Sequence, residues 1–218
     1  MFMKTIEEQV RHNGMQALFS TPVFLSEIID EELLDNTIES ILKLRESGGG
    51  YARYGSWVTD DNLQTLPEFE ELAKVLLHEA GRALDKLTIK RDSHYITCMW
   101  SNIAPVGSSH NEHIHSNSMY SGVLYLKMPE GAATTIFSDP RPGVAIFRPE
   151  YENPNPYFLG SRWSISQQKG GLIIFPSWLP HSVEPVPVTD NPEERITLSF
   201  NVMIRSKVEI DTAGIEFK

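Results

Sequence analysis

The sequence predicts an α+β protein in which N-terminal helices pack on one face of a jelly-roll-like β core. Two amphipathic stretches, at about 27–47 and 67–87, fill most of the first 90 residues. After them, short runs rich in β-branched and aromatic residues alternate with clusters of Gly, Pro, Asn and Asp, which is typical of a sandwich or barrel. We therefore expect a single domain over 1–218, with mainly helical support in 1–90, the β core in 91–206 and a tail at 207–218.

Both N-terminal stretches carry apolar residues at helical spacing. Ser26 is the expected N-cap of the first helix, and the glycines at 48–50 end it. The first stripe consists of Ile28, Ile29, Leu33, Leu34, Ile38, Ile41, Leu42 and Leu44, and the second of Phe69, Leu72, Val75, Leu76, Ala80, Leu84 and Leu87. A short strand at 18–25 precedes them, and the expected strands of the core are 95–101, 121–127, 134–137, 144–147, 161–167, 171–175 and 195–204.

Composition and charge narrow the class of protein. The formal net charge is −10, which gives no general attraction to nucleic acid or to an anionic membrane. Cys98 is the single cysteine, so an intramolecular disulfide framework is excluded. The sequence contains no apolar run long enough to span a membrane and no apolar core of a signal peptide, so a cytoplasmic protein is expected. The oligomeric state is left open.

Three of the seven histidines fall within six residues, at His110, His113 and His115. In a regular strand, side chains two residues apart point to the same face. His113 and His115 would then project together and could share one metal ion, whereas the opposite face would present His110 and Glu112. A polar surface loop with incidental histidines is the simpler alternative.

A fourth histidine supports a metal site. The apolar run at 171–179 is expected to be a buried strand that turns and presents His181 at its end. A site that joins this histidine to the cluster at 110–115 explains both features together. Imidazole and carboxylate ligands with open coordination positions suit non-haem Fe(II) chemistry.

The run at 195–200 alternates strictly between polar and apolar residues. Ile196, Leu198 and Phe200 face one way, and Arg195, Thr197 and Ser199 face the other. An ordinary half-exposed strand would explain this pattern. If the polar face instead lines the mouth of a barrel, the Arg195 guanidinium can bind a carboxylate with two hydrogen bonds, and a neighbouring hydroxyl group can donate a further one.

These blocks in their order resemble the 2-oxoglutarate and Fe(II)-dependent oxygenases, and within them a poorly characterised branch near the prolyl 4-hydroxylase type. The resemblance rests on His-x-His at 113–115, Ser-Gly-Val-Leu-Tyr-Leu at 121–126, Phe-Ser-Asp-Pro-Arg at 137–141, Gly-Leu-Ile-Ile-Phe-Pro-Ser-Trp-Leu-Pro-His at 171–181 and Arg-Ile-Thr-Leu-Ser-Phe-Asn at 195–201. The resemblance covers about residues 98–204. The sequence Leu-Phe-Ser-Thr-Pro-Val-Phe at 18–24 also resembles the start of proteins in that branch. The resemblance implies a double-stranded β-helix, related to the cupins, with Fe(II) at its open end.

The resemblance also implies roles for single residues. His113 matches the first metal ligand and His181 the distal one. Arg195 matches the arginine that binds the far carboxylate of 2-oxoglutarate, Thr197 fits a hydroxyl two residues later, and Tyr125 matches a tyrosine that touches the same carboxylate.

The sequence departs from the family pattern at the second ligand position. His115 stands where the family has Asp or Glu. The site could be formed by three histidines, or His110 and Glu112 could be the pair instead, or His115 could leave a position open. We favour His113 and His115, because this pair is the better placed of the two relative to the expected strand at 121–127.

The expected activity is an Fe(II)- and 2-oxoglutarate-dependent dioxygenase that uses O2, releases succinate and CO2, and hydroxylates a small-molecule or peptidyl substrate. Trp100, Asn102, Trp163, Trp178 and the proline-rich loop at 148–160 are candidates for the substrate side. The alternatives are a cupin-like metal enzyme that does not use 2-oxoglutarate, which would need no arginine, and a non-enzymatic jelly roll, which would bind no metal.

Overall fold

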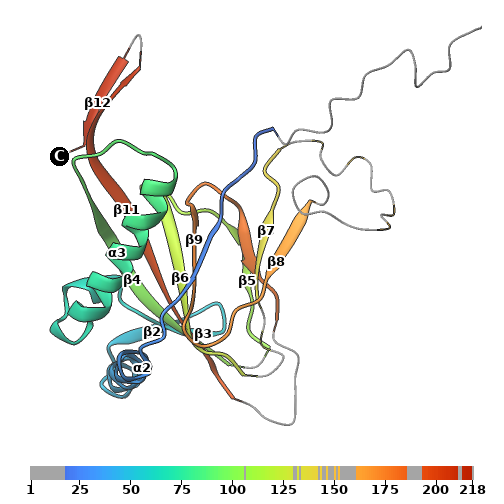
Figure 1. Ribbon diagram of the computed structural model, residues 1–218. Helices are drawn as coiled ribbons and strands as arrows, with labels where there is room; N and C mark the ends of the chain where they lie inside the picture. Colours follow the sequence, from blue (N-terminus) through green and yellow to red (C-terminus); the bar gives the residue numbers. More distant parts are fainter. Residues whose placement is uncertain are drawn as a thin grey trace, which may run out of the picture.

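Two β-sheets form the body of the protein, and two helices cover the larger one (Figure 1). The computed structural model describes residues 18–105, 107–129, 132, 134–141, 143, 146, 150, 152, 161–185, 193–210 and 213–217. Within these residues, the larger sheet has the strand order β1-β9-β6-β11-β4-β3-β2, with β12 paired to β11, and the smaller sheet has the order β5-β10-β7-β8. The strands are β1 (Phe24–Glu27), β2 (Gly50–Arg53), β3 (Ser56–Thr59), β4 (Ser93–Ala104), β5 (His110–His113), β6 (Tyr120–Lys127), β7 (Thr135–Ser138), β8 (Arg162–Ile165), β9 (Gly171–Pro176), β10 (His181–Val183), β11 (Arg195–Ile210) and β12 (Ala213–Phe217).

The two helices are α2 (Glu31–Glu46) and α3 (Glu70–Lys86), close to their expected positions. The predicted N-cap at Ser26 was wrong. Ser26 lies in β1, where it pairs with Leu172, and Asp30 caps α2 by accepting a 3.0 Å hydrogen bond from the backbone N–H of Leu33. Short 3₁₀ turns at Leu63–Thr65 and Pro67–Phe69 lead into α3.

The main core lies between the helices and one face of the larger sheet. Leu34 and Ile41 of α2 and Leu76 of α3 are fully buried against apolar residues of β4, β6 and β11. Figure 1 shows both helices on the side of this sheet that faces away from β5, β7 and β8. The opposite face of the larger sheet is therefore free to form a site with the smaller sheet.

Most of the expected strands are present, and the α+β class is confirmed. The strand expected at 144–147 lies outside the described residues, apart from residue 146. The N-terminal 90 residues contribute β1, β2 and β3 as well as the helices, and β11 runs on to Ile210 and forms a hairpin with β12, where we expected a tail. Two facing antiparallel sheets are the architecture expected for a jelly-roll-like core.

Candidate active site

A cavity of about 490 Å³ opens between the two sheets. Residues of β4, β6 and β11 line it from the larger sheet, and residues of β5, β7 and β10 line it from the smaller sheet. The β2–β3 hairpin adds Tyr51, Arg53 and Tyr54 to the lining. The cavity therefore has polar walls from both sheets and an additional edge from the hairpin.

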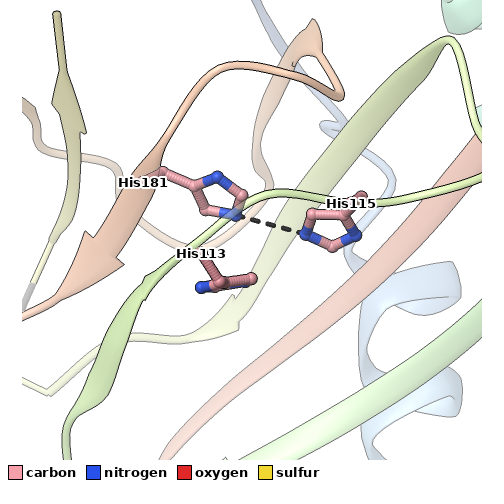
Figure 2. A group of neighbouring side chains, drawn as sticks. All are labelled: His113, His115 and His181. Atoms are coloured by element: carbon pink, nitrogen blue, oxygen red, sulfur yellow. Dashed lines mark hydrogen bonds between the residues drawn. The ribbon is translucent and has the colours of Figure 1, made fainter. Parts of the chain in front are cut away.

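Three histidine side chains converge in this cavity, although they come from distant parts of the chain. His113 ends β5 and pairs across the small sheet with His181, the first residue of β10. His115 follows β5, and its backbone N–H donates a 2.9 Å hydrogen bond to the carbonyl of Ser177. One ring nitrogen of each histidine lies within 4.8 Å of the other two, and the Nε2 atoms of His115 and His181 are 3.2 Å apart (Figure 2).

Backbone carbonyls orient two of the three rings. The Nδ1 atom of His181 is 3.0 Å from the carbonyl of Leu179, and the Nδ1 atom of His113 is 2.8 Å from the carbonyl of Asn111. Because a carbonyl only accepts, Nδ1 carries the proton in each ring and Nε2 keeps its lone pair. This is the arrangement that metal-binding histidines use, in which the second ring nitrogen donates to a fixed acceptor.

Burial keeps these imidazoles neutral. Burial lowers the pKa of His181 to about 3 and that of His115 to about 4, and the charge of His113 acts in the same direction on both. Burial also lowers the pKa of His113, against the hydrogen bond to Asn111. At neutral pH all three rings are therefore uncharged, and each keeps one ring nitrogen whose lone pair can bind a cation.

His110 and Glu112, the alternative ligand pair, take different positions because β5 is irregular. His181 pairs with His113 and Val183 pairs with His110, so four residues of β5 lie opposite three residues of β10. This bulge brings the His110 ring to 4.1 Å from the ring of His113, instead of placing it on the opposite face. The Glu112 carboxylate accepts a hydrogen bond from the hydroxyl of Ser138. Among the described residues, the group that could hold a metal ion consists of His113, His115 and His181.

The donor set fits a divalent transition metal such as Fe(II). Imidazole nitrogens suit Fe, Zn, Cu and Ni, and neighbouring ligands that each bond a metal at about 2.0–2.1 Å lie about 3 Å apart. The 3.2 Å between Nε2 of His115 and Nε2 of His181 matches that separation. Three protein donors would leave further coordination positions of a bound metal open for small ligands.

A second polar group lies on the large-sheet side of the cavity. Arg195 and Thr197 of β11 are buried and line it, as does Tyr125 of β6, which pairs with Thr197. Burial lowers the pKa of the Arg195 guanidinium, while the Tyr125 hydroxyl acts in the opposite direction. The Tyr125 hydroxyl also forms a 2.5 Å hydrogen bond with Thr135 of β7, which ties the two sheets together. A buried guanidinium beside hydroxyl groups can bind a carboxylate.

The candidates for the substrate side divide into two groups. Trp100 and Asn102 of β4 line the cavity, and the indole of Trp100 stacks on the His115 ring at 5.6 Å. Trp163 and Trp178 are half exposed and do not line it. The loop at 148–160 lies outside the described residues, apart from residues 150 and 152.

Sequence reasoning missed two parts of the cavity wall. Asn201 continues the polar alternation of Arg195, Thr197 and Ser199, so an extension of that pattern by two residues would have found it. The β2–β3 hairpin gave no such signal, because its contribution depends on pairing with β4.

Comparisons with known proteins agree with this geometry. Residues 98–201 match the family described as "Putative 2OG-Fe(II) oxygenase". No curated protein sequence matches the chain.

Similar folds occur among solved structures of oxygenases. A prolyl-4-hydroxylase from Pseudomonas putida is 14% identical, with a TM-score of 0.59 over 85% of this chain and 94% of that one. The α-ketoglutarate-dependent epimerase SnoN of nogalamycin biosynthesis is 12% identical, with a TM-score of 0.61 over 84% of this chain and 79% of that one. A prolyl hydroxylase from Trichoplax adhaerens, solved with a hypoxia inducible factor peptide, is 13% identical, with a TM-score of 0.56 over 84% and 83%. At these identities the likeness shows the fold, a double-stranded β-helix.

In the part of the chain that the structure describes, no helix has the length and apolar character to cross a membrane. The matched segment, 98–201, contains the candidate metal ligands and the candidate 2-oxoglutarate contacts, which are His113, His115, Tyr125, His181, Arg195 and Thr197. Residues 98–201 thus match the model of a 2OG-Fe(II) oxygenase family, whose members use Fe(II), 2-oxoglutarate and O2, and the chain shares the fold of solved oxygenases.

Proposed function

We propose that this oxygenase hydroxylates a small-molecule or peptidyl substrate at a three-histidine iron centre. One observation supports this most strongly: neutral ring nitrogens of His113, His115 and His181 lie within 4.8 Å of one another in the cavity that Arg195 also lines. A carboxylate is absent from this group within the described residues, which distinguishes the centre from the two-histidine, one-carboxylate arrangement.

In this proposal His113, His115 and His181 hold Fe(II). When bound, the metal and 2-oxoglutarate supply the oxidising chemistry, in which O2 and the co-substrate are converted so that one oxygen atom enters succinate, CO2 leaves and the other oxygen atom enters the substrate. The protein supplies three neutral ligands. The metal with its ligands therefore keeps a charge of +2, one unit more than a site with one carboxylate. This charge strengthens the attraction between the site and the dianionic co-substrate.

Arg195 binds the far carboxylate of 2-oxoglutarate in this proposal, and the hydroxyl groups of Thr197 and Tyr125 donate to the same carboxylate. The low-dielectric surroundings of these buried groups strengthen the attraction between guanidinium and carboxylate. Holding the distal end fixes the co-substrate in one orientation, so that its keto acid end is directed into the cavity toward the histidines.

The substrate enters on the side of the β2–β3 hairpin. Arg53 lies over the ring of Tyr54 at 5.1 Å, and that ring lies 5.4 Å from the ring of His110, which contacts His113. This row of neighbouring groups runs from the hairpin to the proposed metal-binding histidines. Its exposed end offers aromatic and cationic contacts to a planar or anionic part of a substrate.

The assignment of the ligands can be tested by measuring bound iron. Wild-type protein reconstituted anaerobically is expected to hold one Fe(II) per chain by elemental analysis and to form succinate from 2-oxoglutarate in the presence of O2. His113→Ala, His115→Ala and His181→Ala are each expected to lose stoichiometric iron, because two imidazoles alone bind weakly.

His110→Ala and Glu112→Gln are the matched controls, since both residues lie in β5 beside the proposed ligands. They are expected to keep one iron per chain. Iron that survives His115→Ala but is lost in Glu112→Gln would assign the centre to the alternative pair. Absence of bound iron in the wild type would contradict the proposed centre as a whole.

A further inference from the structure

Two charged side chains of the cavity wall have no role in the iron and 2-oxoglutarate sites. They are Arg53, the last residue of β2, and Asp61, which follows β3, and both are exposed at the rim. Arg195 is assigned to the co-substrate, and the carboxylate of Glu112 is hydrogen-bonded to the hydroxyl of Ser138. Among the described residues, neither Arg53 nor Asp61 forms a salt bridge. One cation and one anion of the wall are therefore available to a ligand.

These two charges lie at opposite ends of the part of the wall that β4 forms. Asp61 is beside Met99, whose backbone N–H donates a 2.9 Å hydrogen bond to the Asp61 carbonyl. Arg53 is at the other end, in the hairpin whose Trp57 pairs with Ile103. Ile103 is four residues beyond Met99, which corresponds to about 13 Å of strand at about 3.3 Å per residue. A ligand that contacts both charges must therefore extend along β4.

The segment of β4 between the two charges is beside the proposed metal ligands. Trp100 and Asn102 belong to this segment and line the cavity. The indole of Trp100 stacks on the ring of His115, with 5.6 Å between the ring centroids. A ligand that spans this segment would therefore present its middle, and not one of its charged ends, to the metal centre.

The turn of the β2–β3 hairpin holds the cationic end in place. Tyr54 and Gly55 have φ angles of 50° and 77°, as the two central residues of a type I′ turn do. The left-handed region is unfavourable for tyrosine, and strained residues of this kind cluster at ligand-binding sites. The Arg53 guanidinium lies over the Tyr54 ring at 5.1 Å, and that ring lies 5.4 Å from the ring of His110. These contacts keep the charge of Arg53 at the cavity rim.

We propose that the substrate is a free amino acid with a cationic side chain, which binds Arg53 through its carboxylate and Asp61 through its side-chain cation. The α-ammonium and α-carboxylate groups share one carbon atom, so they are too close together to reach both ends of the wall. The inference rests on the proposed function. A C–H bond between the two charged ends becomes C–OH, with O2 and 2-oxoglutarate as the oxidant, so that one oxygen atom enters the product and the other enters succinate.

Size and charge both favour this class of substrate. The cavity of about 490 Å³ must accommodate the metal ion, 2-oxoglutarate and the substrate together, whereas cavities of about 300–1,000 Å³ usually serve one small ligand. A substrate with two anionic ends would be repelled by Asp61, and one with two cationic ends by Arg53. In a peptide, an amide replaces the α-carboxylate, which would leave Arg53 without a charged partner. A small zwitterion satisfies both charges.

The test compares lysine, ornithine and arginine with analogues that each lack one charge. Norleucine, norvaline and citrulline lack the side-chain cation, and the three C-terminal amides lack the carboxylate. Dissociation constants are measured by anaerobic calorimetry on the full-length chain loaded with Fe(II) and 2-oxoglutarate. We expect at least one of the three amino acids to bind about fivefold more tightly than its neutral analogue and its amide. Admission of O2 should then add one oxygen atom to that amino acid, measured by mass spectrometry.

Two variants assign each charge of the amino acid to its partner. Arg53→Gln should weaken binding of the preferred amino acid by about fivefold but change that of its amide by less than about twofold, because the amide has no carboxylate. Asp61→Asn should likewise weaken the amino acid and leave its neutral analogue unchanged. Asp60→Asn is the matched control, since Asp60 is exposed beside Asp61 but is not part of the cavity wall, and it should change neither affinity.

The inference is overturned if none of the three amino acids binds more tightly than both of its analogues. It is also overturned if Arg53→Gln weakens the amide as much as the amino acid. The iron content of the same samples tests the proposed centre separately. Wild-type protein without iron would reject the centre and this inference with it, whereas iron-loaded protein without a preference for the zwitterion rejects the inference alone.

Discussion

Both faces of β11 are buried, but one face packs in the hydrophobic core and the other lines the cavity. On one face, Ile196, Leu198 and Phe200 are between 0% and 3% exposed and pack against the helices. On the other face, Arg195 is 7% and Thr197 5% exposed, yet these side chains line the cavity. Burial alone therefore does not separate the core from the site. The chemistry of the buried atoms does.

The two faces contribute differently to the free energy of folding. Burying apolar surface contributes about 25 cal/mol per Å², whereas burying an uncompensated polar group costs about 1–3 kcal/mol in protein mutational data. A strand selected for stability alone would place apolar residues on both faces, as β9 does over Gly171–Pro176. The polar face of β11 is retained at the expense of stability. Substitutions on the apolar face should therefore lower the stability of the protein, whereas substitutions on the polar face should weaken the binding of 2-oxoglutarate.

The largest effect is expected on the apolar face, from Phe200→Ala. The ring of Phe200 fills the space above Gly122, where an added Cβ would lie 2.3 Å from it, so little can move in to close the cavity. We expect the free energy of unfolding to fall by about 3–5 kcal/mol, measured by urea denaturation. Ile29→Ala is the control, because Ile29 is 81% exposed and its loss should change stability by less than about 0.5 kcal/mol. A cost below about 1 kcal/mol for Phe200→Ala would show that this face is not the core of the fold.

The next largest effect is expected on the polar face, from Arg195→Gln. Loss of the guanidinium should weaken 2-oxoglutarate binding by about 100-fold, or about 2.7 kcal/mol, because a buried carboxylate loses its charged partner. Calorimetric titration of the metal-loaded protein measures this. Arg53→Gln is the matched control, since Arg53 also lines the cavity but lies on the hairpin, and it should change the affinity by less than about threefold. A large loss of 2-oxoglutarate affinity in Arg53→Gln, with little loss in Arg195→Gln, would place the co-substrate on the hairpin side of the cavity.

The smallest effect is expected from Thr197→Val, which keeps the shape of the side chain and removes the hydroxyl. One neutral hydrogen-bond donor contributes about 1 kcal/mol, so 2-oxoglutarate affinity should fall by about fivefold. Ser199→Ala, two residues further along the same face, should change it by less than about twofold. Equal effects of the two variants would mean that the co-substrate contacts this face without a defined orientation.

The alternating pattern of residues 195–200 predicted both faces of β11, because the period of a strand is local information. The site was harder to predict where it depends on a partner strand. The bulge in β5, which brings His110 to the side of His113, arises from pairing with β10 about 70 residues away and has no signal in the six residues themselves. The same reason explains Ser26, which pairs in β1 instead of capping α2. Asn201 was missed because the alternating pattern was followed only as far as residue 200, although its parity places it on the polar face.

The most direct test of the account is an anaerobic titration of the wild type and His181→Ala with Fe(II) and 2-oxoglutarate, followed by visible absorption. The account predicts a weak metal-to-ligand charge-transfer band in the wild type that requires both additions, because the keto acid binds the metal held by His113, His115 and His181. It also predicts that the band is lost in His181→Ala. A band of the same strength in His181→Ala, or iron bound to the wild type without a band, would contradict the proposed centre.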